Sequence, residues 1–124
     1  MKLIVCLDEA MGMAFNNRRQ SRDKEVIKKI KEITSESPLY INEYSCDLFS
    51  DGALGVPVDG FYFAEVDLPQ GEPDEIYAFY WNRRYPADLK FTTDLSLYDI
   101  VSTCEFAGSS HEKITLIHYR RKNL

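Results

Sequence analysis

The stretch KLIVCLDEAMGMAFNNRRQSRDKEVIKKI, residues 2–30, predicts a buried strand, then a loop, then an amphipathic helix. Its first part, 2–8, is a continuous apolar run that ends in an aspartate, which is typical of a central strand buried on both faces. Apolar residues at helical spacing predict a helix over 21–34, with Ser21 as the expected N-cap. This order of elements indicates an α/β fold.

The chain after this helix predicts mainly strands. A second strand is expected at 39–42, parallel to the first, and a short helix is expected within 43–49. Further aromatic or apolar runs predict strands at 61–66, 75–81, 97–106 and 113–121, and residues 88–91 form either a short strand or a turn. The last two of these strands are expected to pair antiparallel. The sequence therefore predicts a single α/β domain over 1–124, with a mixed, mostly β sheet and two helices.

The composition excludes several classes of protein. The 124 residues are 44% hydrophobic and 28% charged, which suits one globular domain without disordered tracts. No apolar run approaches the roughly 20 residues that a membrane span needs, so no membrane partner is expected. The three cysteines are far apart and form no C-x-x-C pair, so we expect them to be reduced in a cytoplasmic protein. They are Cys6, Cys46 and Cys104.

Charge is distributed unevenly along the chain. The net charge of −5 makes nucleic acid an unlikely partner. No Lys or Arg occurs between Glu32 and Asn82, whereas seven of the fifteen basic residues fall between Arg18 and Lys31. Either the basic and acidic parts neutralise each other in the folded protein, or a basic face stays open to an anionic ligand.

The two histidines, His111 and His118, lack the spacing of a metal site. No H-x-H or C-x-x-C motif occurs, so no metal is expected. His118 lies in a predicted strand. The segment AGSSHEK, 107–113, is typical of a hairpin tip, but such a turn also presents backbone N–H groups to an anion, with His111 as acid or base. A Ser-His-Asp arrangement stays open, although the G-x-S-x-G motif is missing.

Two segments supply candidate ligand-binding residues. NNRRQSRDKE, 16–25, lies at the predicted strand–helix junction, where α/β proteins bind anions. YWNRRYPADLKF, 80–91, places arginines and aromatic rings just after a strand; the alternative is an exposed turn that pairs with the acidic middle of the chain. Together with the 107–113 turn they give the candidates Arg18, Arg19, Asp23, Asn82, Arg83, Arg84, Tyr85 and His111.

The beginning of the chain is similar to that of dihydrofolate reductases. LIVCLDEAMGMAFNN, the basic stretch, Asp23 and the helix, and then PLYIN follow the reductase order of strand, mobile loop, helix and strand. The tail, from EIYAFYW through ADLKF and YDIVSTCEF to SSHEKITLIHYRR, is similar in outline to the last three reductase strands. The resemblance implies a dihydrofolate reductase-like fold, with Asp23 near the substrate-binding carboxylate.

Several positions depart from the reductase pattern. Arg18, Arg19 and Gln20 stand where the reductases have a Pro-Trp pair, and Phe79 stands where they have the threonine that supports the carboxylate. The middle of the chain is short, and Gly60 alone precedes FYFAEV in place of the glycine-rich cofactor turn. We therefore expect a shortened reductase-like fold with no cofactor and no reductase activity.

A second resemblance concerns short bacterial proteins of unknown function that often carry the label ribonuclease Z. NNRRQSRD, NEYS, WNRRYPADL and GSSHEKI are the segments that resemble them. The label implies a dinuclear zinc hydrolase with an H-x-H-x-D-H motif, which this sequence lacks. We therefore do not expect a zinc-dependent ribonuclease Z activity.

Three functions remain open from the sequence. The first is a non-catalytic domain that binds an anionic small molecule at the strand–helix junction. The second is a protein-interaction or homodimerisation module with exposed tyrosines, such as Tyr44, Tyr85 and Tyr98, in its contact patch. The third is an enzyme that uses Asp23 or His111 as acid or base.

Overall fold

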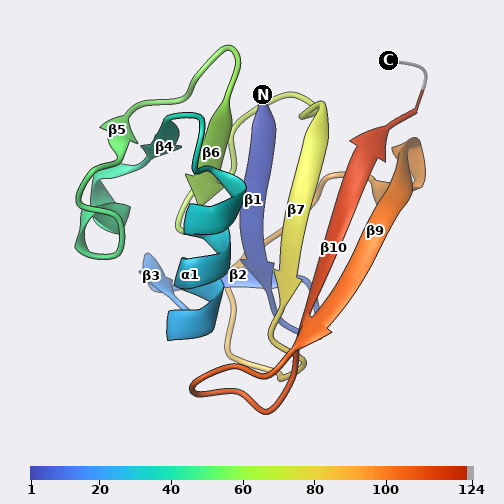
Figure 1. Cartoon of the computed structure of the whole chain (residues 1–124). Helices are drawn as coiled ribbons and strands as arrows, with labels where there is room; N and C mark the ends of the chain where they lie inside the picture. Colours follow the sequence, from blue (N-terminus) through green and yellow to red (C-terminus); the bar gives the residue numbers. More distant parts are fainter. Residues whose placement is uncertain (123–124) are drawn as a thin grey trace.

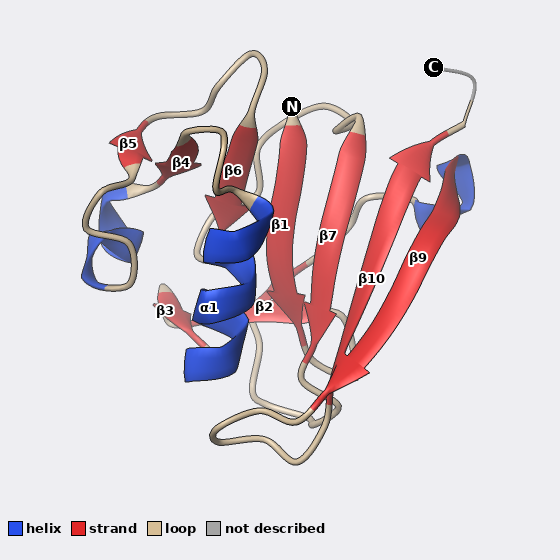
Figure 2. Cartoon of the chain, in the orientation of Figure 1, coloured by secondary structure: helices blue, strands red, loops and turns tan. Residues whose placement is uncertain are grey.

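The computed structural model describes residues 1–122 as two sheets and one α-helix (Figures 1 and 2). The larger sheet has seven strands in the order β5-β4-β6-β1-β7-β10-β9, and the smaller has three in the order β3-β2-β8. The larger sheet consists of β1 (Lys2–Leu7), β4 (Leu39–Ile41), β5 (Ala53–Leu54), β6 (Phe61–Ala64), β7 (Glu75–Tyr80), β9 (Tyr98–Phe106) and β10 (Ile114–Arg121). The smaller sheet consists of β2 (Gly12–Phe15), β3 (Arg18–Arg19) and β8 (Leu89–Lys90). The helical segments are α1 (Lys24–Ile33) and the 3-10 turns η1 (Glu43–Asp47) and η2 (Leu95–Leu97).

Strand β1 occupies the centre of the larger sheet. It lies between β6 and β7 and is parallel to both. Parallel pairing continues through β4 and β5, whereas β10 and β9 add an antiparallel hairpin at the other side. The carboxyl ends of β1, β6 and β7 therefore meet at one edge. In α/β sheets this edge is where ligands usually bind.

A hydrophobic cluster packs on each face of the larger sheet. On one face, Val26 and Ile30 of α1 pack with Ile4 and Phe79. On the other face, the small sheet contributes Met13. Successive residues of a strand point to opposite faces, so β1 is apolar from Leu3 to Leu7 because both of its faces are covered.

The predicted fold class is confirmed, with corrections in detail. Asp23, and not Ser21, is the N-cap of α1: its carboxylate accepts a hydrogen bond from the backbone N of Glu25 at 2.9 Å. The second expected helix, within 43–49, is a 3-10 turn. Strand β6 lies between β1 and β4, so these two strands, which were expected to form a parallel pair, are not neighbours. The segment after β1, expected to be a loop, contains β2.

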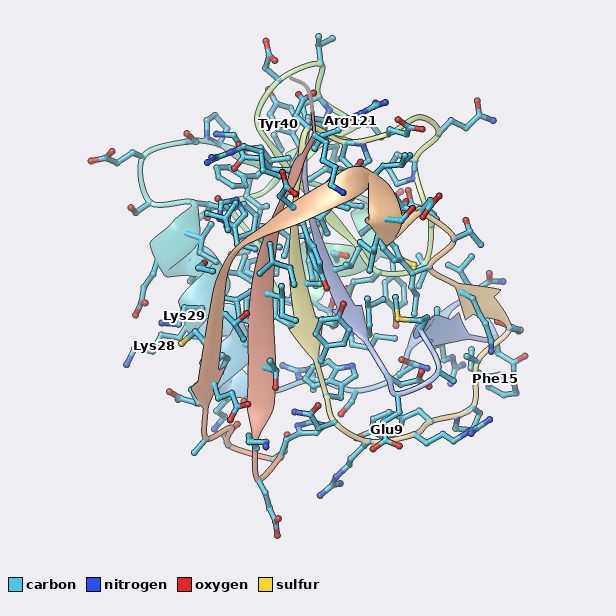
Figure 3. The ribbon with its side chains drawn as sticks, turned by 90° about the vertical axis from the view of Figure 1, so that its right-hand side faces the viewer. Glu9, Phe15, Lys28, Lys29, Tyr40 and Arg121 are labelled. Atoms are coloured by element: carbon cyan, nitrogen blue, oxygen red, sulfur yellow. The ribbon has the colours of Figure 1, made fainter. Side chains whose placement is uncertain are left out.

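The prediction that Tyr98 is exposed and belongs to a contact patch of tyrosines is wrong. Its side chain is 5% exposed, and its hydroxyl donates a hydrogen bond to the carbonyl oxygen of Pro73 at 2.6 Å. The edge strand β9 nevertheless exposes Ile100 by 61% and Val101 by 44%. Figure 3 views the molecule from the side that β9 forms.

Within residues 1–122, no helix has both the length and the apolar character that crossing a membrane requires.

Candidate functional site

Three parallel strands end in polar or aromatic residues at the same edge of the sheet. Asp8 follows β1, Glu65 follows β6 and Trp81 follows β7, and all three are buried. The loop between β9 and β10 reaches the same end of the molecule and passes below the N-terminal end of α1 (Figure 1). Figure 3 shows Glu9, the residue after Asp8, at this lower end.

Asp8 is a buried carboxylate held by four hydrogen bonds. Its oxygens accept from the backbone N of Ala10 at 2.8 Å, Gly12 at 2.7 Å and Tyr85 at 3.2 Å, and from Nε2 of Gln20 at 3.0 Å. Burial raises the pKa of Asp8, but these hydrogen bonds to the charged form outweigh it, so the pKa lies below its usual value. Asp8 therefore ties the loop after β1 to the loop after β7.

Asp23 is a second buried carboxylate, 3% exposed, at the N-terminus of α1. Besides capping the helix, it accepts hydrogen bonds from the backbone N of Ser109 at 3.0 Å and of Ser110 at 2.8 Å. Burial raises the pKa of Asp23, but the bonds from Ser109, Ser110 and His111 lower it well below its usual range. An ionised Asp23 has no proton to give at neutral pH, so it cannot serve as a general acid.

His111 is 4% exposed and has partners on both ring nitrogens. Nδ1 lies 3.0 Å from a carboxylate oxygen of Asp23. Because the carboxylate only accepts, Nδ1 carries a hydrogen. Nε2 lies within hydrogen-bond distance of two hydroxyl groups. These are the Tyr85 hydroxyl at 2.8 Å and Ser21 Oγ at 3.3 Å. The ring of Trp81 stacks on the imidazole, with 4.5 Å between centroids.

Arg19 is bound by two carboxylates. Its guanidinium donates to Glu65 at 2.7 and 3.0 Å and to Asp47 at 2.9 and 2.8 Å. Glu65, which is 7% exposed, also accepts from Ser45 Oγ at 2.7 Å. The guanidinium lies over the ring of Tyr44 as well, 4.7 Å from its centroid. Arg19 therefore holds η1 against the end of β6. Its guanidinium is occupied by these two carboxylates and is not available to a ligand.

The two basic segments of the chain lie side by side. Nε2 of Gln20 donates both to Asp8 and, at 3.3 Å, to the carbonyl oxygen of Pro86. The backbone N of Glu9 donates to the carbonyl oxygen of Arg83 at 2.9 Å. Segments 18–22 and 83–86 therefore flank the same carboxyl edge of the sheet.

The remaining predicted site residues differ in their surroundings. Arg18, Arg83 and Arg84 are exposed. Asn82 adopts a positive φ of 58°, and its amide donates to the carbonyl oxygen of Lys113 at 3.1 Å, so it joins β7 to β10. Sequence reasoning missed five polar residues of the site, although two of them directly follow apolar strands. The five are Asp8, Gln20, Ser21, Glu65 and Ser110.

Side chains fill the interior below this edge. Two cavities of about 10 Å³ each adjoin Ser21, one toward Gln20 and one toward Val26. Neither holds more than one water molecule. Any larger ligand therefore binds on the rim of the site and not inside it. Among residues 1–122, no group of three or more His, Cys, Asp or Glu side chains is arranged to hold a metal ion.

The strand order and the single covering helix place the chain in the class of dihydrofolate reductase-like α/β folds. A similar solved structure is that of dihydrofolate reductase from Enterococcus faecalis, complexed with NADP(H) and RAB-propyl. The two share 13% identity and a TM-score of 0.69, over 98% of this chain and 96% of the other. At that identity the likeness shows the fold alone.

Sequence comparisons assign this chain to no protein family. No protein-family model and no curated protein matches the chain, so the resemblance to proteins labelled ribonuclease Z has no support there. Phe79, the position that the reductase resemblance assigns to a supporting threonine, is fully buried. The 107–113 loop supports the Asp23 carboxylate instead.

Proposed function

We propose that this protein is a small binding domain that takes an anionic small molecule at the junction of β1 and α1. The ligand would contact an arginine rim, which consists of Arg18, Arg22, Arg83 and Arg84. The observation that carries the proposal is the joining of segments 18–22 and 83–86 by Asp8 and Gln20. Arginine forks bind carboxylate and phosphate groups in a bidentate manner.

The charges at this edge are arranged favourably for an anion. The carboxylates of Asp8 and Asp23 face inward, and backbone N–H groups bind both of them. All four arginines of the rim are exposed, and none forms an ion pair with another residue of the described part of the chain, 1–122. The rim therefore presents arginines outside any ion pair of the described residues, although Arg22 lies near enough to Asp47 to contribute, after Arg19, to lowering the pKa of that carboxyl. The protein as a whole has a net charge of −5.

Pyrophosphate should stabilise the protein against heat, and the double variant Arg83→Ala/Arg84→Ala should lose this effect. At ten times the dissociation constant, binding adds about 1.4 kcal/mol, which is about 5 °C in Tm for a chain of this size. The measurement is thermal unfolding at fixed low salt with increasing pyrophosphate.

The matched control is Lys28→Ala/Lys31→Ala, which removes the same charge from exposed positions of α1 (Lys28 is labelled in Figure 3). We expect the control to keep the pyrophosphate shift. Equal shifts in the rim variant and the wild-type protein would contradict the proposal, because the rim arginines would then not contact the anion.

A second candidate function, homodimerisation through β9, rests on the exposed edge of the larger sheet. The nine residues of β9 include no Lys, Arg or Pro, which natural edge strands use to block pairing.

Ile100→Lys should convert a dimer to a monomer in sedimentation equilibrium. Val58→Lys, at a 91% exposed valine between β5 and β6, is the control and should leave the dimer intact. A wild-type protein that stays monomeric at 0.1 mM and above (about ten times a typical assay concentration) would rule this candidate out.

A further inference from the structure

Ser21, His111 and Asp23 form a continuous chain of hydrogen bonds. Ser21 Oγ lies 3.3 Å from Nε2 of His111, and Nδ1 of the same ring lies 3.0 Å from Asp23. This is the atom order of a serine nucleophile, its general base and the carboxylate that orients the base. We propose that Ser21 is an activated nucleophile that reacts with small carboxylic esters.

The surroundings of the three residues suit these roles. His111 and Asp23 are 4% and 3% exposed, whereas Ser21 is half-buried and so reaches solvent. The backbone N–H groups of Ser109 and Ser110 hold the Asp23 carboxylate, which fixes the Nδ1–H tautomer of His111. The Trp81 ring stacks on the imidazole at an interplanar angle of 21° and restrains its rotation. The base is thus held in position before a substrate arrives.

Tyr85 shares Nε2 of His111 with Ser21. Its hydroxyl lies 2.8 Å from that nitrogen, nearer than Ser21 Oγ at 3.3 Å. A neutral imidazole nitrogen has one lone pair, so the two hydroxyls compete for it. Removing the Tyr85 hydroxyl therefore leaves Nε2 to Ser21 alone and should increase the reactivity of Ser21.

The space around Ser21 limits the substrate class. The two cavities beside it are about 10 Å³ each, too small for an acyl group. An ester must therefore approach Oγ from the solvent side. The favoured substrates are esters with a small acyl group and a good leaving group. The inference does not depend on the arginine rim, because a neutral ester needs no contact with it.

The reaction balances without a further reactant except water. Ser21 Oγ bonds to the acyl carbon while its proton passes to Nε2 of His111. The C–O bond to the leaving group breaks, and the leaving alkoxide takes the proton from His111. Water then attacks the acyl-enzyme by the same route, which releases the carboxylic acid and restores Ser21.

The test uses the full chain with p-nitrophenyl acetate. We expect a burst of one equivalent of nitrophenol and an acetyl group on Ser21 in peptide mass spectrometry. Ser21→Ala should abolish the burst, and Tyr85→Phe should accelerate acetylation severalfold. Ser102→Ala, an exposed serine on β9, is the control and should react like the wild-type protein.

Either of two results would overturn the inference. One is an acetyl group found only on lysines, cysteines or the N-terminus, with the same rate in Ser21→Ala. The other is a Ser21 that becomes acetylated no faster than Ser102, because an unactivated serine would behave in that way. Both readouts are independent of pyrophosphate binding, so they leave the proposed binding function untouched.

Discussion

Replacing Asp23 by alanine is expected to lower the free energy of unfolding by about 3–5 kcal/mol. The change removes the N-cap of α1 and leaves the N–H groups of Ser109, Ser110 and His111 without their acceptor. Unpaired polar groups in buried positions are costly because they have lost water as well. The measurement is urea-induced unfolding at pH 7.

Asp94→Ala is the matched control, since Asp94 also caps a helical segment, η2, but is exposed. Its loss should cost much less than the loss of Asp23, because its hydrogen-bond partners stay in contact with water. The pH dependence gives a second check. The pKa of Asp23 is lowered by folding, so its contribution is complete above the carboxyl pKa of the unfolded chain, about 3.9. The difference between wild type and Asp23→Ala should therefore shrink as the pH falls below about 4. A difference that stays constant down to pH 2 would contradict this assignment.

Arg19→Ala is expected to lower the free energy of unfolding by about 3 kcal/mol. It removes the cation from Glu65, a carboxylate that is only 7% exposed, and leaves it with Ser45 as its hydrogen-bond donor. Arg19→Lys should recover only part of the loss, because an ammonium group cannot bridge Glu65 and Asp47 with paired bonds.

A double variant separates the buried charge from the lost packing. Glu65→Gln in the Arg19→Ala background should regain stability, since the amide removes the unpaired buried charge. In the wild-type background the same substitution should be destabilising. If the two substitutions were simply additive in urea unfolding, Arg19 and Glu65 would not act as a pair.

Hydrophobic periodicity was sufficient to predict the long elements. α1 and the β9–β10 hairpin contain enough residues to show their pattern, and β1 was predicted from its continuous apolar run. Strands β3, β5 and β8 have two residues each and show none, so the small sheet could not be predicted as a sheet. The N-cap was placed two residues early, because Ser21 and Asp23 are both good caps and only tertiary contacts distinguish them.

The sequence named single residues of the candidate site but not their arrangement. Asp23, Tyr85 and His111 were each candidates from the sequence. Their contacts join residues 88 and 26 positions apart, and no local pattern encodes such a separation. The uneven charge distribution left two interpretations open; neutralisation is confirmed at Arg19, and a basic face open to an anionic ligand stays a prediction. Arg19 is neutralised by the acidic middle of the chain, while the arginines of the rim stay exposed.

The reductase resemblance predicted the fold. Its placement of Asp23 near the substrate-binding carboxylate stays a prediction, and it did not predict what supports that carboxylate. Phe79 belongs to the hydrophobic cluster under α1, and backbone N–H groups of the β9–β10 loop bind the Asp23 carboxylate. A carboxylate with its hydrogen-bonding capacity used in this way has little left for a ligand. For this reason the proposed ligand lies on the arginines outside it.

The most direct test of the proposed binding function is a titration of the ¹⁵N-labelled protein with pyrophosphate, followed through its amide NMR signals. We expect saturable shifts in segments 18–22 and 83–86, with Lys28 and Lys31 of α1 unaffected. Shifts confined to α1, or no saturable shift at all, would contradict an anion site at the junction of β1 and α1.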